Sequence, residues 1–329
     1  METTVDTESG LKRFSFQVKP VQRLHWEDTA ADHLVTHEEP VILTGTNVVT
    51  PALRWTLPYL EENMGSTKHT VYLSKSRTFM YYDEKKVGAF PEFREPMKKR
   101  EWTFSKFVDE LKSHMGRKDE YIYYQDALTD AVGTSIKHDF LHFNWKWLND
   151  RRQRYNWGQL TTNLLLISQP GNITPCHYDE QHNYFCQVIQ NIVFFKVMGE
   201  KRCLLFSPAN FSKLYPYPVA HPCDRQSQVD FEYPDYKKFP RFRDVDAFEC
   251  IVKPGDVLYI PMYCQLIMRD SQKKQCQNNK SGPVPSKINY PLNEQQKVAI
   301  TRNIEKMLNE ALQDPAERVH RMLLCFARA

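Results

Sequence analysis

The sequence predicts a mainly β fold with helical flanks, a sandwich or barrel of jelly-roll type. From Leu160 onward it contains short apolar runs, TTNLLLIS, CHYDEQHNYFCQV, KRCLLFSP and FECIVKPGDVLYIP, separated by proline and glycine. Short strands with such punctuation are typical of double-sheet and barrel folds. No internal repeat of solenoid length is visible, which sets that architecture aside.

The helical flank on the N-terminal side has the clearest periodicity. Phe104, Phe107, Val108 and Leu111 follow the spacing of an amphipathic helix that begins near Thr103. A shorter helix is expected at LPYLEENMG, because a glycine ends it. HTVYLS and YIYYQDAL are rich in β-branched and aromatic residues and predict strands.

Two further helices are predicted at the C-terminal end. Asn293 and Gln296 have the spacing of a capping box, and Pro315 opens the second helix. Their apolar residues need a cover, which is either their own domain or the same helices of a second copy in a homodimer. We therefore expect a disordered N-terminus over 1–15, a β-rich domain with N-terminal α/β elements over 16–290, and a helical dimerisation region over 291–329.

Charge and cysteine content restrict the function further. The formal net charge is +4 over 329 residues and is spread along the chain, which argues against a nucleic-acid partner. No apolar run approaches the length of a membrane span, so we expect a soluble protein of the cytoplasm and nucleus without a membrane partner. The eight cysteines include no C-x-x-C pair and are expected to be free thiols.

The stretch TPCHYDEQHNYFCQ contains a candidate metal site. His177 and Asp179 are two positions apart, so in a strand their side chains leave the same face. A non-haem Fe(II) oxygenase site uses two histidines and one carboxylate and keeps open positions for its co-substrates. Lys201 beside such a site would pair with the far carboxylate of 2-oxoglutarate, and Thr174 and Tyr123 would offer hydroxyls to it.

A resemblance to a known family is carried by LLLISQPGNITPCHYDEQHNYF, KRCLLF, LYPYPVAHPCDRQSQVDF, PGDVLYIPMY and QQKVAITRNIEKMLNEAL. These stretches resemble the JmjC-type protein asparaginyl hydroxylases, which are 2-oxoglutarate oxygenases, and the likeness runs from about Phe14 to the end. The resemblance implies a double-stranded β-helix of the JmjC and cupin-like kind, and a dioxygenase that uses Fe(II), 2-oxoglutarate and dioxygen. It implies iron on His177 and Asp179, and 2-oxoglutarate on Tyr123, Thr174, Asn183 and Lys201.

The same resemblance implies a peptide groove and protein partners. Tyr81, Arg225 and Gln226 are expected to line the groove and to orient an asparagine over the iron. The implied substrates are the transactivation segment of hypoxia-inducible factor, in the hypoxia response, and ankyrin-repeat proteins. Dimerisation through the C-terminal helices is implied as well.

The sequence departs from this family at the second iron-binding histidine. That histidine is expected shortly after PMY at 261–263, but the chain continues CQLIMRDSQKK, and His320 is the only histidine from position 222 onward. His182 is three residues from Asp179 and is expected on the opposite face of the strand, and His221 is expected in a loop. The second histidine is therefore missing.

Two segments differ as well. Residues 268–282 are polar and lack alternation, so the jelly roll is expected to be incomplete around 264–286. VIQNIVFFKVM at 188–198 adds about nine residues between Asn183 and Lys201 compared with a short hairpin loop. These departures predict an impaired hydroxylase. The alternative is a catalytically inactive isoform or an aberrant gene product that acts at most as a protein-binding or dimerising module.

Overall fold

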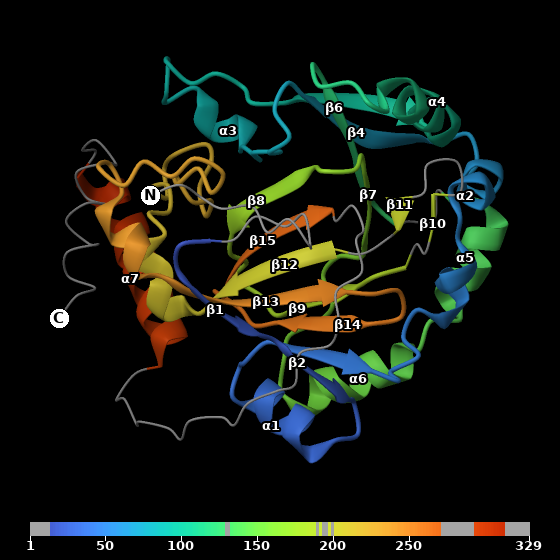
Figure 1. Ribbon diagram of the computed structural model, residues 1–329, viewed down its shortest axis with the longest axis horizontal. Helices are drawn as coiled ribbons and strands as arrows, with labels where there is room; N and C mark the ends of the chain where they lie inside the picture. The colour runs from blue at the N-terminus through green and yellow to red at the C-terminus, as the bar shows by residue number, and fades with distance from the viewer. Residues whose placement is uncertain are drawn as a thin grey trace.

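The computed structural model describes residues 14–128, 132–188, 191–192, 197–198, 201–270 and 293–312. Two sheets face each other in a jelly-roll sandwich (Figure 1), which confirms the predicted fold class. The larger sheet has the order β1 (Gln17–Pro20), β13 (Asp246–Val252), β12 (Lys201–Phe206), β15 (Gln265–Asp270) and β8 (Ile173–His177). The smaller has the order β2 (Gln22–His25), β3 (Val41–Thr44), β14 (Val257–Ile260) and β9 (Asn183–Cys186).

The space between the two sheets is filled by apolar side chains from both. Ile42 and Leu258 of the smaller sheet meet Leu205, Val252 and Leu266 of the larger one in a single buried cluster. The other face of the larger sheet is buried too, because the connection from 207 to 245, with η2 (Pro208–Lys213) and η3 (Pro240–Asp244), packs over it. An inner strand of this sheet therefore has apolar residues on both faces.

A third sheet and most helices surround the sandwich. In Figure 1, β4 (Lys68–Ser74) and β6 (Tyr121–Ala127) lie above it, and α1 (Thr29–Thr36) and α6 (Trp145–Arg154) lie below it. Helix α4 (Phe104–His114) begins where the sequence predicted a helix start near Thr103, and the Thr103 hydroxyl caps it by accepting a hydrogen bond from the Lys106 amide at 3.3 Å. The third sheet has the order β5 (Lys98–Thr103), β4 (Lys68–Ser74), β6 (Tyr121–Ala127) and β7 (Leu164–Ser168). The helices are α1 (Thr29–Thr36), η1 (Thr50–Arg54), α2 (Leu57–Asn63), α3 (Glu84–Val87), α4 (Phe104–His114), α5 (Thr134–Leu141) and α6 (Trp145–Arg154).

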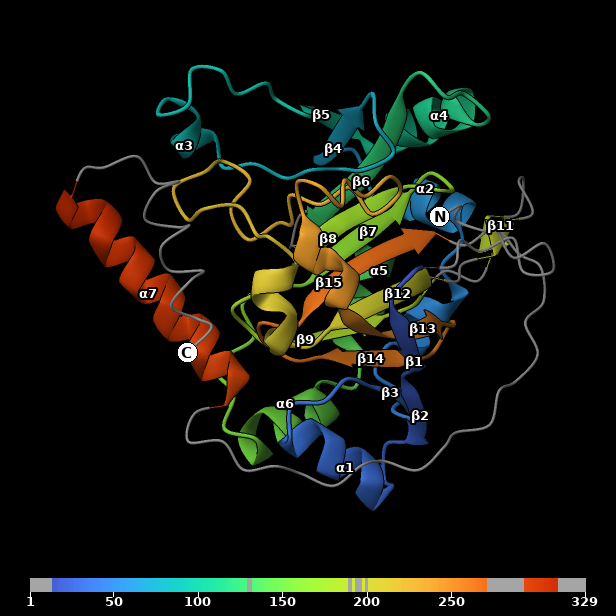
Figure 2. The same ribbon diagram turned by 60° about the vertical axis from the view of Figure 1, so that its left-hand side comes forward.

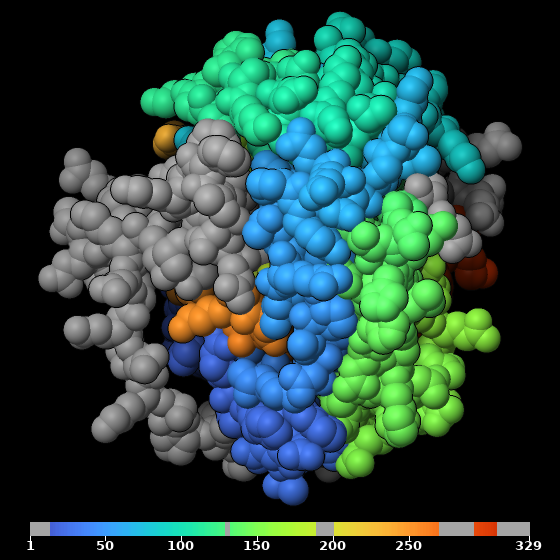
Figure 3. Space-filling view, turned by 90° about the vertical axis from the view of Figure 1, so that its right-hand side faces the viewer, coloured from blue at the N-terminus to red at the C-terminus, as the bar shows by residue number. Residues whose placement is uncertain are grey.

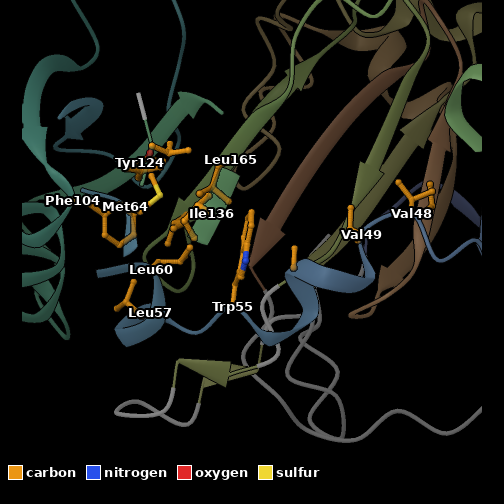
Figure 4. Close-up of a cluster of buried hydrophobic side chains, with 14 of the residues drawn as sticks. Val48, Val49, Trp55, Leu57, Leu60, Met64, Phe104, Tyr124, Ile136 and Leu165 are labelled. Carbon is orange, nitrogen blue, oxygen red and sulfur yellow. The ribbon is translucent and has the colours of Figure 1, made fainter. Parts of the chain in front are cut away.

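A second large apolar cluster joins these helices to the third sheet. Figure 4 shows Trp55 between the side chains around Leu60 and those around Val49. Figure 3 shows the side of the molecule that is on the right in Figure 1. There the blue surface of the N-terminal elements lies against the green surface of residues near α5 and α6. This packing makes the flank and the sandwich one body.

The prediction that the jelly roll is incomplete from 264 onward is wrong for its first part. Residues Gln265–Asp270 form β15, which pairs antiparallel with β12 on one side and with β8 on the other. Leu266 and Met268 face the space between the sheets, and Ile267 packs on the outer cluster. A strand covered on both faces does not need polar and apolar residues to alternate. Residues 271–286 lie outside the described part of the chain.

The insertion and the C-terminal helix are described in part. In the insertion, β10 (Asn191–Ile192) pairs antiparallel with β11 (Val197–Met198). Helix α7 (Glu294–Leu312) runs along one side of the sandwich in Figures 1 and 2. The predicted capping box is present, because the Gln296 amide donates to Asn293 Oδ1 at 2.7 Å and the Asn293 amide donates to Gln296 Oε1 at 3.1 Å. The second predicted helix lies outside the described residues.

Of the predicted disordered segment 1–15, the structure describes only the last two residues. The Phe14 ring stacks on Phe16 with centroids 4.9 Å apart, and the Ser15 hydroxyl lies 2.7 Å from that of Tyr236. Residues 1–13 lie outside the described part. None of the helices within the described ranges combines the length and the apolar character that crossing a membrane requires.

Asp139 of α5 anchors the helical flank, so its substitution is expected to destabilise the fold. Its carboxylate is 2 % exposed, accepts from Trp55 Nε1 at 2.8 Å and Tyr59 Oη at 3.1 Å, and pairs with Arg54. Asp139→Ala leaves the buried indole N–H without an acceptor, which lowers the free energy of unfolding by about 2–3 kcal/mol. Urea unfolding measures it. Asp150→Ala, on the exposed side of α6, should change it by no more than about 0.5 kcal/mol, and equal losses would contradict the prediction.

Candidate functional site

His177 is the last residue of β8, and the main chain holds its imidazole. Nδ1 lies 2.8 Å from the Pro175 carbonyl oxygen. Because a carbonyl only accepts, Nδ1 carries the hydrogen, and Nε2 keeps the lone pair that a metal ion binds. A short antiparallel bridge to Gln226 fixes the main chain of His177 on its other side.

Asp179 follows two residues later, and its carboxylate is held by two side chains from different elements. Oδ2 accepts a hydrogen bond from Asn183 Nδ2 at 2.7 Å, and Oδ1 lies 3.8 Å from Arg225 Nη1. The Tyr263 amide donates to the Asp179 carbonyl at 2.8 Å, which ties the turn before β15 to this motif. The structure thus brings together four of the predicted site residues, His177, Asp179, Asn183 and Arg225.

The strand position across from His177 is occupied by a leucine. Leu266 of β15 is the Cα partner of His177 in the antiparallel pair of β15 and β8. Residues directly opposite each other share a face, with Cβ atoms about 4.5–5.5 Å apart. Leu266 is 5 % exposed and packs in the apolar cluster between the sheets. A histidine at this position would share a face with His177, but the chain has a hydrocarbon side chain there.

The other histidines near the motif are engaged elsewhere. His182 stacks on Trp157 with ring centroids 4.6 Å apart, and its Nδ1 lies 3.0 Å from Tyr259 Oη. His221 stacks on Tyr217 at 4.2 Å. Within the described ranges, no three His, Cys, Asp or Glu side chains are grouped so that they would hold a metal ion. His177 and Asp179 would supply two of the three ligands of a two-histidine, one-carboxylate iron site, so the described residues do not fit such a metal.

The residues predicted to bind 2-oxoglutarate fit a carboxylate better. Lys201, the first residue of β12, is 8 % exposed, and its Nζ lies 5.9 Å from the ring centroid of Tyr123. The Tyr123 hydroxyl is buried and makes no hydrogen bond of standard geometry within the described part of the chain. Thr174 is buried on β8. A buried ammonium is suited to pairing with the carboxylate of a bound anion.

The predicted peptide-binding residues lie on the other side of the motif. Both ends of the Gln226 carboxamide bind the main chain of Tyr81, whose amide donates to Oε1 at 3.0 Å while Nε2 donates to the Tyr81 carbonyl at 2.5 Å. Tyr81 Oη donates to Gln125 Oε1 at 2.7 Å. Arg225 has a side chain 47 % exposed and a φ of 68°. Gln226 therefore fixes the loop, and Arg225 presents its donors to solvent.

A cavity of about 900 Å³ reaches two of these residues. Asn183 and Lys201 line it together with aromatic side chains, whereas His177 and Asp179 are not among its lining residues. The volume lies in the range of small-molecule sites. The aromatic part of the lining is Trp55, Phe140, Phe143, Trp145, Tyr155, Trp157, Tyr184 and Phe185.

Sequence reasoning missed three residues of this region. In the sequence, Leu266 stood out only because it lies in a stretch that departs from the family. The alternation of a strand does place it between the sheets, since Cys264, Leu266 and Met268 are every second residue and all lie in the apolar cluster there. Gln125 and the C-terminal Arg302, which contacts Glu180 and Asp224, are far from the motif in sequence and carry no local signal.

Comparison with known proteins decides the family. A model of the cupin-like domain matches residues 27–264. The chain belongs to the cupin-like domain family. Lysine-specific demethylase 8 of Xenopus tropicalis is 26 % identical over 70 % of this chain and 45 % of its own length. The tRNA wybutosine-synthesizing protein 5 of Gallus gallus is 24 % identical over 68 % of this chain and 64 % of its own length.

A shorter match, to JmjC domain-containing protein D of Dictyostelium discoideum, is 39 % identical over 29 % of this chain and 19 % of that protein. These relatives place this cupin-like domain in the JmjC class, which confirms the resemblance at that level. The chain spans about half the length of the demethylase relatives that it matches.

The burial of His182 in this cupin-like domain predicts a pH-dependent stability. Burial lowers the pKa of His182 to about 4 from an ordinary 6.5. Between these two pKa values the unfolded chain binds more protons than the folded chain. The contribution of neutral His182 to the free energy of unfolding is therefore complete above pH 6.5, and up to about 3 kcal/mol of it is lost as the pH falls towards 4. His182→Phe, which keeps a ring against Trp157, should flatten this slope in urea unfolding from pH 4.5 to 7.5.

His138→Gln is the control, because the His138 side chain is 67 % exposed and should leave the slope unchanged. An H182F variant with the slope of the unmodified chain would show that other groups cause it.

Proposed function

We propose that this chain binds asparagine-bearing protein segments, as expected for a relative of the JmjC-type protein asparaginyl hydroxylases, and that it hydroxylates them poorly. The observation that carries the proposal is the pairing of Leu266 with His177, which removes one metal ligand and leaves the surrounding strands in place. The proposed partners are the transactivation segment of hypoxia-inducible factor and ankyrin-repeat proteins.

Arg225 is the main support for peptide binding. Its guanidinium is half-exposed beside Asp179, on a loop that Gln226 fixes to Tyr81. Five N–H donors in a fixed plane match the carbonyl and carboxamide oxygens of a peptide. A substrate asparagine bound by Arg225 would lie over the His177–Asp179 motif.

The two co-substrate sites have different prospects. Lys201 and Tyr123 fit a carboxylate of 2-oxoglutarate. Asn183, which was predicted to bind 2-oxoglutarate as well, donates its side-chain amide to Asp179. Fe(II), with 2-oxoglutarate and dioxygen, would supply the oxidative chemistry in a complete site. Because the described part of the chain offers only His177 and Asp179 as ligands, we propose 2-oxoglutarate binding with weak iron affinity.

The names of the relatives suggest a second candidate, lysine demethylation. The stretches that resemble the asparaginyl hydroxylases favour asparagine instead. Both reactions need the same three-ligand iron in this class, so the missing ligand weakens either one, while binding of a protein segment does not depend on it.

We also propose a homodimer that works in the cytoplasm and nucleus. Helix α7 exposes Ile300, Ile304 and Met307, which are 45 %, 40 % and 68 % exposed, and a second copy would cover them. The dispersed charge favours protein over nucleic-acid partners.

Restoring the ligand tests the central step. Leu266→His places an imidazole directly opposite His177 on the same face, so Fe(II) should bind at least about 10-fold more tightly than to the unmodified chain. Anaerobic titration with and without 2-oxoglutarate measures the affinity.

The matched control is Ile267→His, one residue along, which faces the outer cluster and should not raise the affinity. Tight binding of Fe(II) by the unmodified chain, abolished by His177→Ala, would contradict the proposal.

Substitution of Arg225 tests the peptide site. Arg225→Ala should weaken binding of a fluorescent ankyrin-repeat peptide that contains asparagine by about 10-fold, because the half-exposed guanidinium is its main donor. Fluorescence anisotropy measures the Kd. Arg117→Ala is the control, since Arg117 is 45 % exposed and pairs only locally with Asp119. Equal effects of both substitutions, or no binding by the unmodified chain, would refute the proposed peptide function.

A further inference from the structure

Arg302 is a buried cation in the middle of helix α7. Its side chain is 3 % exposed, and its guanidinium carbon lies 5.3 Å from the ring centroid of Tyr178. Nη1 and Nη2 donate to the two carboxylate oxygens of Asp224 at 2.9 and 3.0 Å. Nε donates to Glu180 Oε1 at 3.1 Å. One side chain of α7 therefore holds two acidic residues that are 44 positions apart, at 180 and 224.

Both acidic partners are direct neighbours of the candidate site. Glu180 follows Asp179, and Asp224 precedes Arg225. Asp179 of the motif forms an ion pair with Arg225, with 3.8 Å between Oδ1 and Nη1. Arg302 thus holds the side chains of the two residues that adjoin the members of that pair in the sequence.

Further contacts hold the same loop against α7. Glu305, three residues after Arg302 on the helix, accepts from the Val219 amide at 2.8 Å. Lys86 donates to Asp224 Oδ2 at 3.1 Å and to the Val219 carbonyl at 2.7 Å. The Tyr178 amide donates to the Arg225 carbonyl at 3.3 Å. The loop 219–226 is therefore held between α7 and the strand of His177.

We propose that Arg302 is a positioning residue, through which helix α7 sets the geometry of the Asp179–Arg225 pair and hence the affinity for a bound peptide. The inference rests on the proposed function for its peptide readout, but its structural part stands on the contacts alone. The proposed peptide site would then depend on helix α7, although the predicted peptide-binding residues Tyr81, Arg225 and Gln226 lie outside that helix.

Arg302→Lys in the full chain tests the role. Lysine keeps the charge, but one ammonium cannot replace a planar fork that serves Asp224 and Glu180 together. Hydrogen exchange of the Asp224 and Gln226 amides, which bond within this loop, should become about 10-fold faster, and the peptide Kd should rise about 10-fold.

Val298→Ala is the matched control on the same helix. Val298 is 4 % exposed and packs with Tyr178 and Phe211, so its truncation loosens α7 and leaves the ion pairs in place. It should lower the melting temperature and leave loop exchange and the peptide Kd within about twofold of the unmodified chain. Equal changes in V298A and R302K, or no change in R302K, would overturn the inference.

Two outcomes separate this inference from the proposed function. If the unmodified chain does not bind the peptide while R302K still speeds loop exchange, the proposed function fails and the positioning role stands. If R302K does not fold, Glu180→Gln removes one arm at a half-exposed position. It should speed exchange at Tyr178 and in the loop, and unchanged exchange would overturn the role.

Discussion

The main-chain pairing of β15 with β12 on one edge and with β8 on the other holds the candidate site together. β8 carries Thr174 and His177, and β12 begins with Lys201. Strand register is fixed by backbone hydrogen bonds and by burial of alternate side chains, so the residue opposite His177 lies there whatever its type. A leucine at this position satisfies the fold completely. A substitution at position 266 can therefore change whether the site could hold a metal while the strands keep their pairing.

The Asp179 carboxylate of the motif has partners within the protein. Asp179 has an amide donor from Asn183 and a guanidinium from Arg225. Further out, Arg302 balances Glu180 and Asp224. A carboxylate provided with these partners is stable in the folded protein. These contacts therefore hold the motif in shape with a leucine opposite His177.

The features that the sequence predicted correctly are those with local causes. The helix that begins at Thr103, the strand at Tyr121–Ala127 and the cap formed by Asn293 and Gln296 each depend on neighbours within a few residues. The H-x-D spacing is also a local signal, and the role that it suggests for His177 and Asp179 stays a prediction. The JmjC class followed from longer stretches.

The features that were missed depend on distant contacts. β15 was expected to be broken because its composition is unlike that of a half-exposed strand, but it is an inner strand covered on both faces. Arg302 meets Asp224 and Glu180 across 78 and 122 positions, so no local pattern announces it. The engagement of Gln226 by the Tyr81 main chain is equally remote in sequence.

The short N-terminal strands have a consequence for solubility. β1 lies at the edge of the larger sheet beside β13, and β2 lies at the edge of the smaller one beside β3, so one segment crosses from sheet to sheet at Val21. Each strand has four residues, and Lys19 and Arg23 place charges on them. Short, charged edge strands discourage another chain from adding on. Residues 17–25 thus cover one edge of each sheet. Their loss would expose the backbone groups of β13 and β3, to which another chain could add and so cause aggregation.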